Sequence, residues 1–251
     1  MRPHIPGTAP GGLVAVAEPA QVMLPEELTF GDTRRWINAH LHRVHLCNDT
    51  VSVHGVAVAH GDCAVLLLGA HGSGKSLTGL ALMTRHGWRA VAGDTVQVHV
   101  GNGTPLVVGG TGAYQVRRQE TRCWFPELRL PLRGSDIVDI SAQLPSDPRA
   151  GMPLVAAIHV AVDSGPSSND AMVRCDGQTA RNAWYRASGH LVDKVLDDHH
   201  ADPLRLVETT EVARQRIRLV RRLAASIGYR WLRGSPHHLA ETITNWIGTK
   251  E

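Results

Sequence analysis

The segment Gly69-Ala70-His71-Gly72-Ser73-Gly74-Lys75-Ser76 combines residue types that bind phosphate groups. Its spacing, Gly-x-x-x-x-Gly-Lys-Ser, is a complete P-loop motif. The glycines let the backbone turn its N–H groups inward as a nest for an anion. In such a loop Lys75 reaches the β- and γ-phosphates, and the Ser76 hydroxyl holds Mg²⁺. The motif predicts that residues 69–77, with Leu77 as the last of them, bind a nucleoside triphosphate.

The residues on either side of this loop have the patterns that a P-loop requires. Residues 64–68 form a continuous apolar run, typical of a buried strand in a parallel sheet. After the loop, Leu77, Leu80, Ala81 and Met83 repeat at helical spacing. The positive end of that helix's dipole would add to anion binding. Strand, loop and helix in this order argue against a chance match in a glycine-rich turn.

Further strands are expected close to this core. Residues 51–60 have a strand pattern, and Gly61-Asp62 would join them to the strand of the loop as a hairpin. Residues 88–94 predict a strand that ends in a polar tip at Asp94. Residues 109–151 are irregular and rich in proline, so we expect mobile loops that face the substrate there.

The remaining chain predicts one domain over residues 13–251, preceded by a flexible tail at residues 1–12 that is rich in proline and glycine. Apolar runs and helical periodicity predict the other elements. Strands are expected at 13–17, 21–24, 95–100, 105–108, 155–162 and 229–232. Helices are expected at 33–41, 178–187, 191–196, 209–227 and 236–247.

Composition restricts the function classes. The net charge of +3 over 251 residues is too small to indicate nucleic acid binding. The helix at 209–227 carries five arginines, for which a solvated face is favoured over a nucleic-acid surface. These are Arg214, Arg216, Arg218, Arg221 and Arg222.

The sequence contains few patterns that indicate targeting or metal binding. No apolar run approaches the roughly 20 residues that span a bilayer, and residues at the N-terminus lack the basic and then apolar pattern of a secretory signal. We therefore expect a cytoplasmic protein without a membrane partner. The four cysteines lack C-x-x-C spacing, and the 15 histidines are scattered without paired ligand spacing. Neither a disulfide framework nor a histidine metal site is therefore expected.

Residues 51–98 resemble the catalytic core of HPr kinase/phosphorylase and of the shorter HPr-kinase-like proteins. The matching pieces are Ser52-Val53-His54-Gly55-Val56, the loop Gly69 to Ser76, and Val91-Ala92-Gly93-Asp94-Thr95-Val96. The resemblance implies an α/β fold: a P-loop core of the HPr-kinase/PEP-carboxykinase-like type with a mixed sheet and flanking helices. It also implies transfer of a phosphoryl group from ATP, with Mg²⁺, to a hydroxyl group.

The same resemblance assigns site residues. It implies that His54 lies near the γ-phosphate and that Asp94 lies at the magnesium ion or the attacking hydroxyl. The catalytic set expected is then Asp94, His54 and Lys75, with Ser76 and Asp94 as metal ligands. The alternative for Asp94 is a turn-forming aspartate, and for His54 a core histidine.

Two features depart from the family pattern. The family's acidic pair is Gly93-Asp94 here, so the first carboxylate is missing. Leu130-Pro131-Leu132-Arg133-Gly134 only partly matches a downstream family signature. Arg133 is therefore a candidate phosphate contact by analogy, with a plain loop arginine as the alternative.

Three functions follow from these observations. The first is an ATP-dependent kinase acting on a hydroxyl of a small sugar- or nucleoside-like metabolite. The stretch before the core, residues 1–50, is too short for the separate N-terminal domain that the protein-substrate enzymes carry. This favours the hypothesis of a kinase acting on a small metabolite. The second is a serine kinase acting on a peptide or protein, and the third is a degenerate ATP-binding regulatory module. A homo-oligomer is left open.

Overall fold

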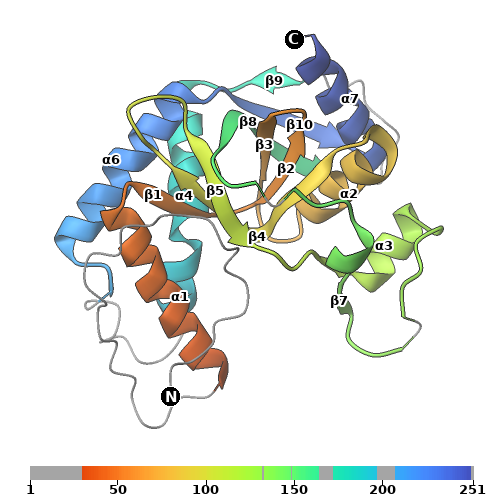
Figure 1. Ribbon diagram of the computed structural model, residues 1–251, viewed down its shortest axis with the longest axis horizontal. Helices are drawn as coiled ribbons and strands as arrows, with labels where there is room; N and C mark the ends of the chain where they lie inside the picture. Colours follow the sequence, from red (N-terminus) through yellow and green to blue (C-terminus); the bar gives the residue numbers. More distant parts are fainter. Residues whose placement is uncertain (1–29, 132, 148, 164–171, 197–206, 250–251) are drawn as a thin grey trace.

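A mixed β-sheet runs through the chain, and helices cover both of its faces (Figure 1). The computed structural model describes residues 30–131, 133–147, 149–163, 172–196 and 207–249. The tail predicted at residues 1–12 and the strands predicted at 13–17 and 21–24 lie outside these residues. None of the described helices is both long enough and apolar enough to cross a membrane.

The described elements follow one another along the chain in this order. The strands are β1 (Thr50–His54), β2 (Val56–His60), β3 (Cys63–Leu68), β4 (Arg89–His99), β5 (Leu106–Thr111), β6 (Gln115–Arg117), β7 (Ile137–Asp139), β8 (Met152–Val162), β9 (Val173–Arg174) and β10 (Tyr229–Gly234). The helices are α1 (Phe30–Cys47), α2 (Lys75–His86), α3 (Arg118–Trp124), α4 (Gly177–Leu196), α6 (Thr210–Ser226) and α7 (Pro236–Gly248), with a 3-10 turn, η1 (Ser141–Gln143).

The strand order in the main sheet is β1-β4-β2-β3-β8-β10-β9, and β5 pairs with both β4 and β8. β3, β8 and β10 run parallel to one another, while β1, β2 and β4 are antiparallel to their neighbours. β2 and β3 form the expected hairpin across Gly61-Asp62. The predicted α/β class with a mixed sheet and flanking helices agrees with this arrangement.

Alternation along β3 explains how one strand supports two helical layers. Val65 and Leu67 pack in a core with α2 and α7, whereas Leu66 and Leu68 pack in a second core with α4 and α6. All four side chains are fully buried. Figure 1 shows α1, α4 and α6 together on one side of the sheet, and α2 and α7 away from these three helices. The loop that follows β3 is therefore held between two packed layers.

Several expected boundaries were wrong. Residues 51–60 are two strands, because the chain bends at Gly55, where a Cβ would lie 2.9 Å from the carbonyl oxygen of Leu67. β4 continues through Asp94 to His99, so Asp94 occupies a bulge within a strand rather than a strand tip. The helix expected at 33–41 extends over 30–47, and α4 joins two helices that were expected separately.

Residues 109–151 contain more regular structure than their composition indicated. β6 and β7 form a two-stranded sheet, and α3 lies between them in the chain. Buried Tyr114, Val116 and Phe125 anchor this segment in the core that contains α2. Tertiary burial of a few apolar residues therefore orders a segment whose prolines had indicated loops.

Of the five arginines on α6, Arg216 does not belong to a solvated face. Its side chain is buried, and its Nε donates a hydrogen bond of 2.7 Å to Glu208. Its guanidinium also lies over the ring of Tyr185, 4.4 Å from the ring centroid. Arg216 therefore holds α6 against α4, while Arg214, Arg218 and Arg221 are exposed.

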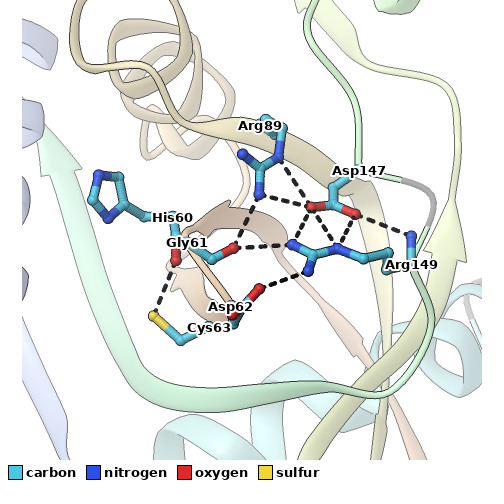
Figure 2. A network of polar contacts seen from close by, with 7 residues as sticks. All are labelled: His60, Gly61, Asp62, Cys63, Arg89, Asp147 and Arg149. Carbon is cyan, nitrogen blue, oxygen red and sulfur yellow. Dashed lines mark hydrogen bonds and ion pairs between the residues drawn. The ribbon is translucent and has the colours of Figure 1, made fainter.

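A polar network fastens the end of β3 that is remote from the P-loop (Figure 2). Asp147, whose side chain is only 4% exposed, accepts hydrogen bonds from Arg89 and Arg149. Both guanidinium groups also donate to the carbonyl oxygen of Gly61. Hydrogen bonds from Arg149, and then from Arg89, lower the pKa of Asp147. The carboxylate therefore ties the β2–β3 turn to β4 and to the segment before β8.

Asp147→Asn is expected to lower the free energy of unfolding by roughly 2 kcal/mol at neutral pH, because charge-assisted hydrogen bonds are lost at a buried position. Since the folded-state pKa lies below the unfolded value, this contribution is present above the unfolded pKa and disappears as the pH falls. The variant should therefore be less sensitive to acid than the wild type. Urea unfolding at neutral and acidic pH measures both effects.

Asp62→Asn is the matched control, because Asp62 contacts Arg149 but its side chain is 94% exposed. We expect a change of at most about 0.5 kcal/mol there. Equal losses in the two variants would contradict a central role for the Asp147 carboxylate.

Candidate functional site

Residues 69–74, the predicted P-loop, form a tight turn between β3 and α2. Gly69 and Gly74 have φ values of 149° and 89°, in a region that side chains rarely enter. Neither position has room for a side chain: a Cβ at Gly69 would lie 2.3 Å from Ser73 Oγ, and one at Gly74 would lie 2.1 Å from Val162 Cγ2. The tight turn therefore requires both glycines.

Helix α2 begins at Lys75 directly after this turn, and no side chain caps its N-terminus. Its first N–H groups are thus left for an anion. Lys75 is buried, and its Nζ donates hydrogen bonds to the carbonyl oxygens of Gly69, at 3.1 Å, and Ala70, at 2.9 Å. The ammonium group is therefore held inside the loop that would receive the phosphates.

A cavity of about 140 Å³ lies against the loop, and we call it the P-loop cavity. It brings together Lys75, Ser76, His54 and Asp94, the residues expected to form the catalytic and metal-binding set. The described lining residues are His54, Val56, His71, Gly72, Gly74, Lys75, Ser76, Leu77, Asp94, Gln115, Val116, Arg117, Glu120 and Ile137. Asp94 and Ser76 offer the hard oxygen ligands that suit Mg²⁺.

Asp94 has a φ of 60°, an unusual backbone conformation for a residue with a side chain. The bulge in β4 produces it, and the carbonyl oxygen of Asp94 accepts a hydrogen bond from the N–H of Gly55 at 3.0 Å. Its carboxylate is 46% exposed, and Oδ1 lies 3.4 Å from Nδ1 of His54. A strained residue that presents a carboxylate to a cavity is typical of functional sites.

The missing first carboxylate has a steric explanation. A Cβ at Gly93 would lie 2.7 Å from the backbone carbonyl oxygen of Ala113. The segment between β5 and β6 therefore occupies the space that an acidic side chain would need.

Sequence reasoning missed Arg117, which lines this cavity, and Tyr114, which braces the helix start beside it. Tyr114 is buried, and its hydroxyl donates a 2.8 Å hydrogen bond to the carbonyl oxygen of Ser76, which braces the start of α2. Arg117 lines the cavity, and its guanidinium lies 3.3 Å from Nε2 of His71. Arg133 is exposed and is not among the described lining residues, so its phosphate contact remains only a prediction.

A second cavity of about 490 Å³ also borders the loop, at Gly69, Ala70 and His71, and we call it the α4 cavity. Its polar wall comes largely from one face of α4, where Thr179, Asn182, Arg186, His190 and Asp193 recur at helical spacing. That spacing is the sequence signal by which this wall could have been found. The other described lining residues are His54, Leu68, Gly69, Ala70, His71, His159, Cys175, Ala183, Ala187, Tyr229 and Trp231.

The two cavities meet at His54 and His71, which line both of them. The imidazole of His54 lies near two others, with ring centroids 4.0 Å from His190 and 6.3 Å from His71. His54 is therefore part of a wall between the cavities rather than a histidine enclosed in the apolar core.

Burial of Lys75 gives phosphate binding a pH dependence. Burial lowers the pKa of its ammonium group from 10.5 to about 8, and the nearby charge of Asp94 offsets only part of this effect. A bound polyphosphate would favour the charged form, so binding takes up a proton above pH 8. We expect nucleotide affinity to fall about tenfold between pH 7.5 and pH 9, measured by isothermal titration calorimetry.

Lys75→Arg is the control for this pH dependence, because a guanidinium group stays charged throughout that range. The nucleotide affinity of this variant should change little between pH 7.5 and pH 9. A wild-type affinity that is equally flat would contradict the assignment of the titration to Lys75.

The comparisons with known proteins add a likeness of fold. No protein-family model matches the chain, and no curated protein matches it. Among solved structures, the chain is similar to the Hpr(Ser) kinase/phosphatase from Coxiella burnetii, with 12% sequence identity and a TM-score of 0.41. The match covers 79% of this chain and 92% of that one. A likeness at this level is a distant one between folds and carries neither activity nor substrate to this chain.

Proposed function

We propose that this chain is an ATP-dependent kinase that transfers the γ-phosphoryl group to a hydroxyl of a small metabolite. The observation that carries the proposal is the P-loop cavity, which Lys75, Ser76 and Asp94 line together. A terminal phosphate bound there would lie among these three side chains. Phosphoryl transfer depends mainly on positioning and on neutralising charge, and these residue types supply both.

The residues have separate roles in this proposal. The N–H groups of residues 69–77 and the ammonium group of Lys75 hold the phosphates, and Ser76 and Asp94 hold Mg²⁺, which neutralises phosphate charge when bound. The acceptor oxygen forms a bond to the γ-phosphorus, the bond from that phosphorus to the β–γ bridging oxygen breaks, and ADP leaves. The hydroxyl proton passes to Asp94 or to His54, which lie 3.4 Å apart.

The α4 cavity favours a small acceptor. Its volume of about 490 Å³ suits a metabolite, and it adjoins the backbone of Gly69 and Ala70. Asn182, Arg186 and Asp193 offer hydrogen-bond donors and acceptors for hydroxyl groups, and Trp231 offers an apolar face. A sugar- or nucleoside-like molecule fits this combination better than a protein surface does.

Gly93 favours a second candidate, a nucleotide-binding module without transfer. The backbone of Ala113 leaves no space for a second carboxylate beside Asp94. Such a module would bind ATP with Mg²⁺ through the same P-loop, and nucleotide occupancy would be its signal. A serine kinase acting on a peptide or protein is the third candidate.

Transfer of labelled phosphate distinguishes the three candidates. The protein is incubated with γ-labelled ATP and Mg²⁺, and with either a pool of small hydroxylated metabolites or a pool of peptides and proteins. Label in the small-molecule pool, absent with Lys75→Ala, is the expected result. Label only in peptides or proteins would establish the third candidate. Nucleotide binding without label in either pool would overturn the kinase proposal and leave the module.

A further inference from the structure

Three side chains that are distant in the sequence meet where the two cavities adjoin. His54 ends β1, Asp94 lies in the bulge of β4, and His190 projects from α4. One nitrogen or oxygen atom of each lies within 4.8 Å of those of the other two. The fold therefore gathers two imidazoles and one carboxylate around a single point.

His54 is the member whose environment requires an explanation. Its side chain is 11% exposed, and both of its ring nitrogens are covered without making a hydrogen bond. Nδ1 approaches Oδ1 of Asp94 at 3.4 Å, yet no hydrogen bond joins them. Covering polar nitrogens in this way costs free energy unless a ligand engages them. We propose that His54, Asp94 and His190 bind a divalent transition-metal ion.

The ligand set determines the class of ion. Two imidazole nitrogens with one carboxylate suit Zn²⁺, Mn²⁺, Fe²⁺ or Co²⁺, whereas Mg²⁺ prefers oxygen ligands alone. With metal–ligand distances near 2.1 Å, neighbouring ligands in a tetrahedral site lie about 3.4 Å apart. The pair formed by His54 and Asp94 already has this separation, and His190 needs only a modest side-chain adjustment.

The site is of the open kind. Three protein ligands leave further coordination positions for water or substrate, as in catalytic rather than structural metal centres. His54 lines both cavities, His190 lines the α4 cavity, and Asp94 lines the P-loop cavity. An ion bound here would therefore be reachable from either side of the wall.

This inference goes beyond the proposed kinase activity, because the transition-metal ion needs no nucleotide. The Mg²⁺ that accompanies ATP would contact Ser76 and the phosphates, and the two oxygens of Asp94 allow that carboxylate to serve both ions. Metal binding can therefore be measured in the nucleotide-free protein.

The test is a titration of metal-free, nucleotide-free protein with Co²⁺, followed by visible absorption and calorimetry, with Mg²⁺ in large excess. We expect one tight site per chain that Zn²⁺ displaces and Mg²⁺ does not. His190→Ala should weaken this site by at least about 100-fold, since loss of outer-shell partners alone costs 10–100-fold. His190→Gln, which fills the space better, repeats the test if the alanine variant unfolds.

Two further variants distinguish metal binding at this cluster from general effects on the α4 cavity and from nucleotide binding. His159 lines the same α4 cavity but lies outside the cluster of His54, Asp94 and His190. The His159→Gln variant should therefore bind Co²⁺ as the wild type does. Lys75→Ala should lose nucleotide affinity and keep Co²⁺ affinity, which separates failure of the metal site from failure of the kinase proposal. Absence of a tight site, displacement by Mg²⁺, or unchanged affinity in a folded His190 variant would overturn the inference.

Discussion

Lys75→Ala is expected to weaken nucleotide binding by about 100-fold and to reduce any phosphoryl transfer by about 1,000-fold. The wild-type ammonium group lies inside the loop, bonded to the carbonyl oxygens of Gly69 and Ala70. From there it would contact the terminal phosphates of a bound nucleotide and stabilise the charge that develops during the proposed transfer. Equilibrium binding of ATP and single-turnover transfer measure the two losses separately.

The same substitution should leave the free protein at least as stable as the wild type. Burial of Lys75 disfavours its charged form, which is why its pKa falls to about 8. Removing the charge removes that cost, so the unfolding midpoint without nucleotide should hold or rise, while the upward shift caused by ATP disappears. Arg85→Ala, at the exposed end of α2, is the matched control. Wild-type ATP affinity in Lys75→Ala would remove the P-loop from the nucleotide site.

Asp94→Asn is expected to lower turnover by about 1,000-fold while nucleotide affinity changes by less than about tenfold. The amide cannot accept a proton and is a weaker magnesium ligand than a carboxylate. Asparagine also tolerates the left-handed conformation that Asp94 adopts, so the bulge in β4 should persist. Steady-state kinetics at several Mg²⁺ concentrations separate loss of the metal ligand, which excess Mg²⁺ partly restores, from loss of a base.

Asp94→Gly is a control variant in which activity should fall but thermal stability should not. Glycine adopts a φ of 60° without strain, so this variant should unfold at the same temperature as the wild type or higher, yet be equally inactive. An Asp94→Asn enzyme with a turnover number near that of the wild type would exclude Asp94 from both of its assigned roles.

The strand, turn and helix around residues 69–76 could be predicted because their information is local. Gly69, Gly74 and Lys75 lie within seven consecutive residues, and the positive φ values of the glycines and the hydrogen bonds of Lys75 arise within the loop itself. Val162 adds a distant reason for glycine at position 74. The β2–β3 hairpin was predictable for the same reason, since Gly61-Asp62 directly separates two apolar runs. The neighbourhood of His54 and Asp94 followed instead from the family resemblance.

The remaining features of the site depend on tertiary contacts that local sequence patterns do not encode. His190 is 136 positions from His54 and reaches it only because α4 packs against the sheet beside β1. The steric reason for Gly93 requires the position of Ala113, and the role of Tyr114 requires the close approach of its hydroxyl to the carbonyl oxygen of Ser76. The continuity of β4 through Asp94 was missed because a polar residue in a bulge has the same local composition as a strand end.

The wall formed by His54 and His71 also has a kinetic consequence. Because the donor and acceptor would approach it from separate cavities, neither molecule has to leave before the other enters. Initial rates measured against ATP at several fixed acceptor concentrations should therefore give intersecting double-reciprocal lines. Parallel lines would indicate that the phosphoryl group rests on the protein between two half-reactions. Separate cavities on the two sides of His54 and His71 would therefore allow both substrates to be bound at once.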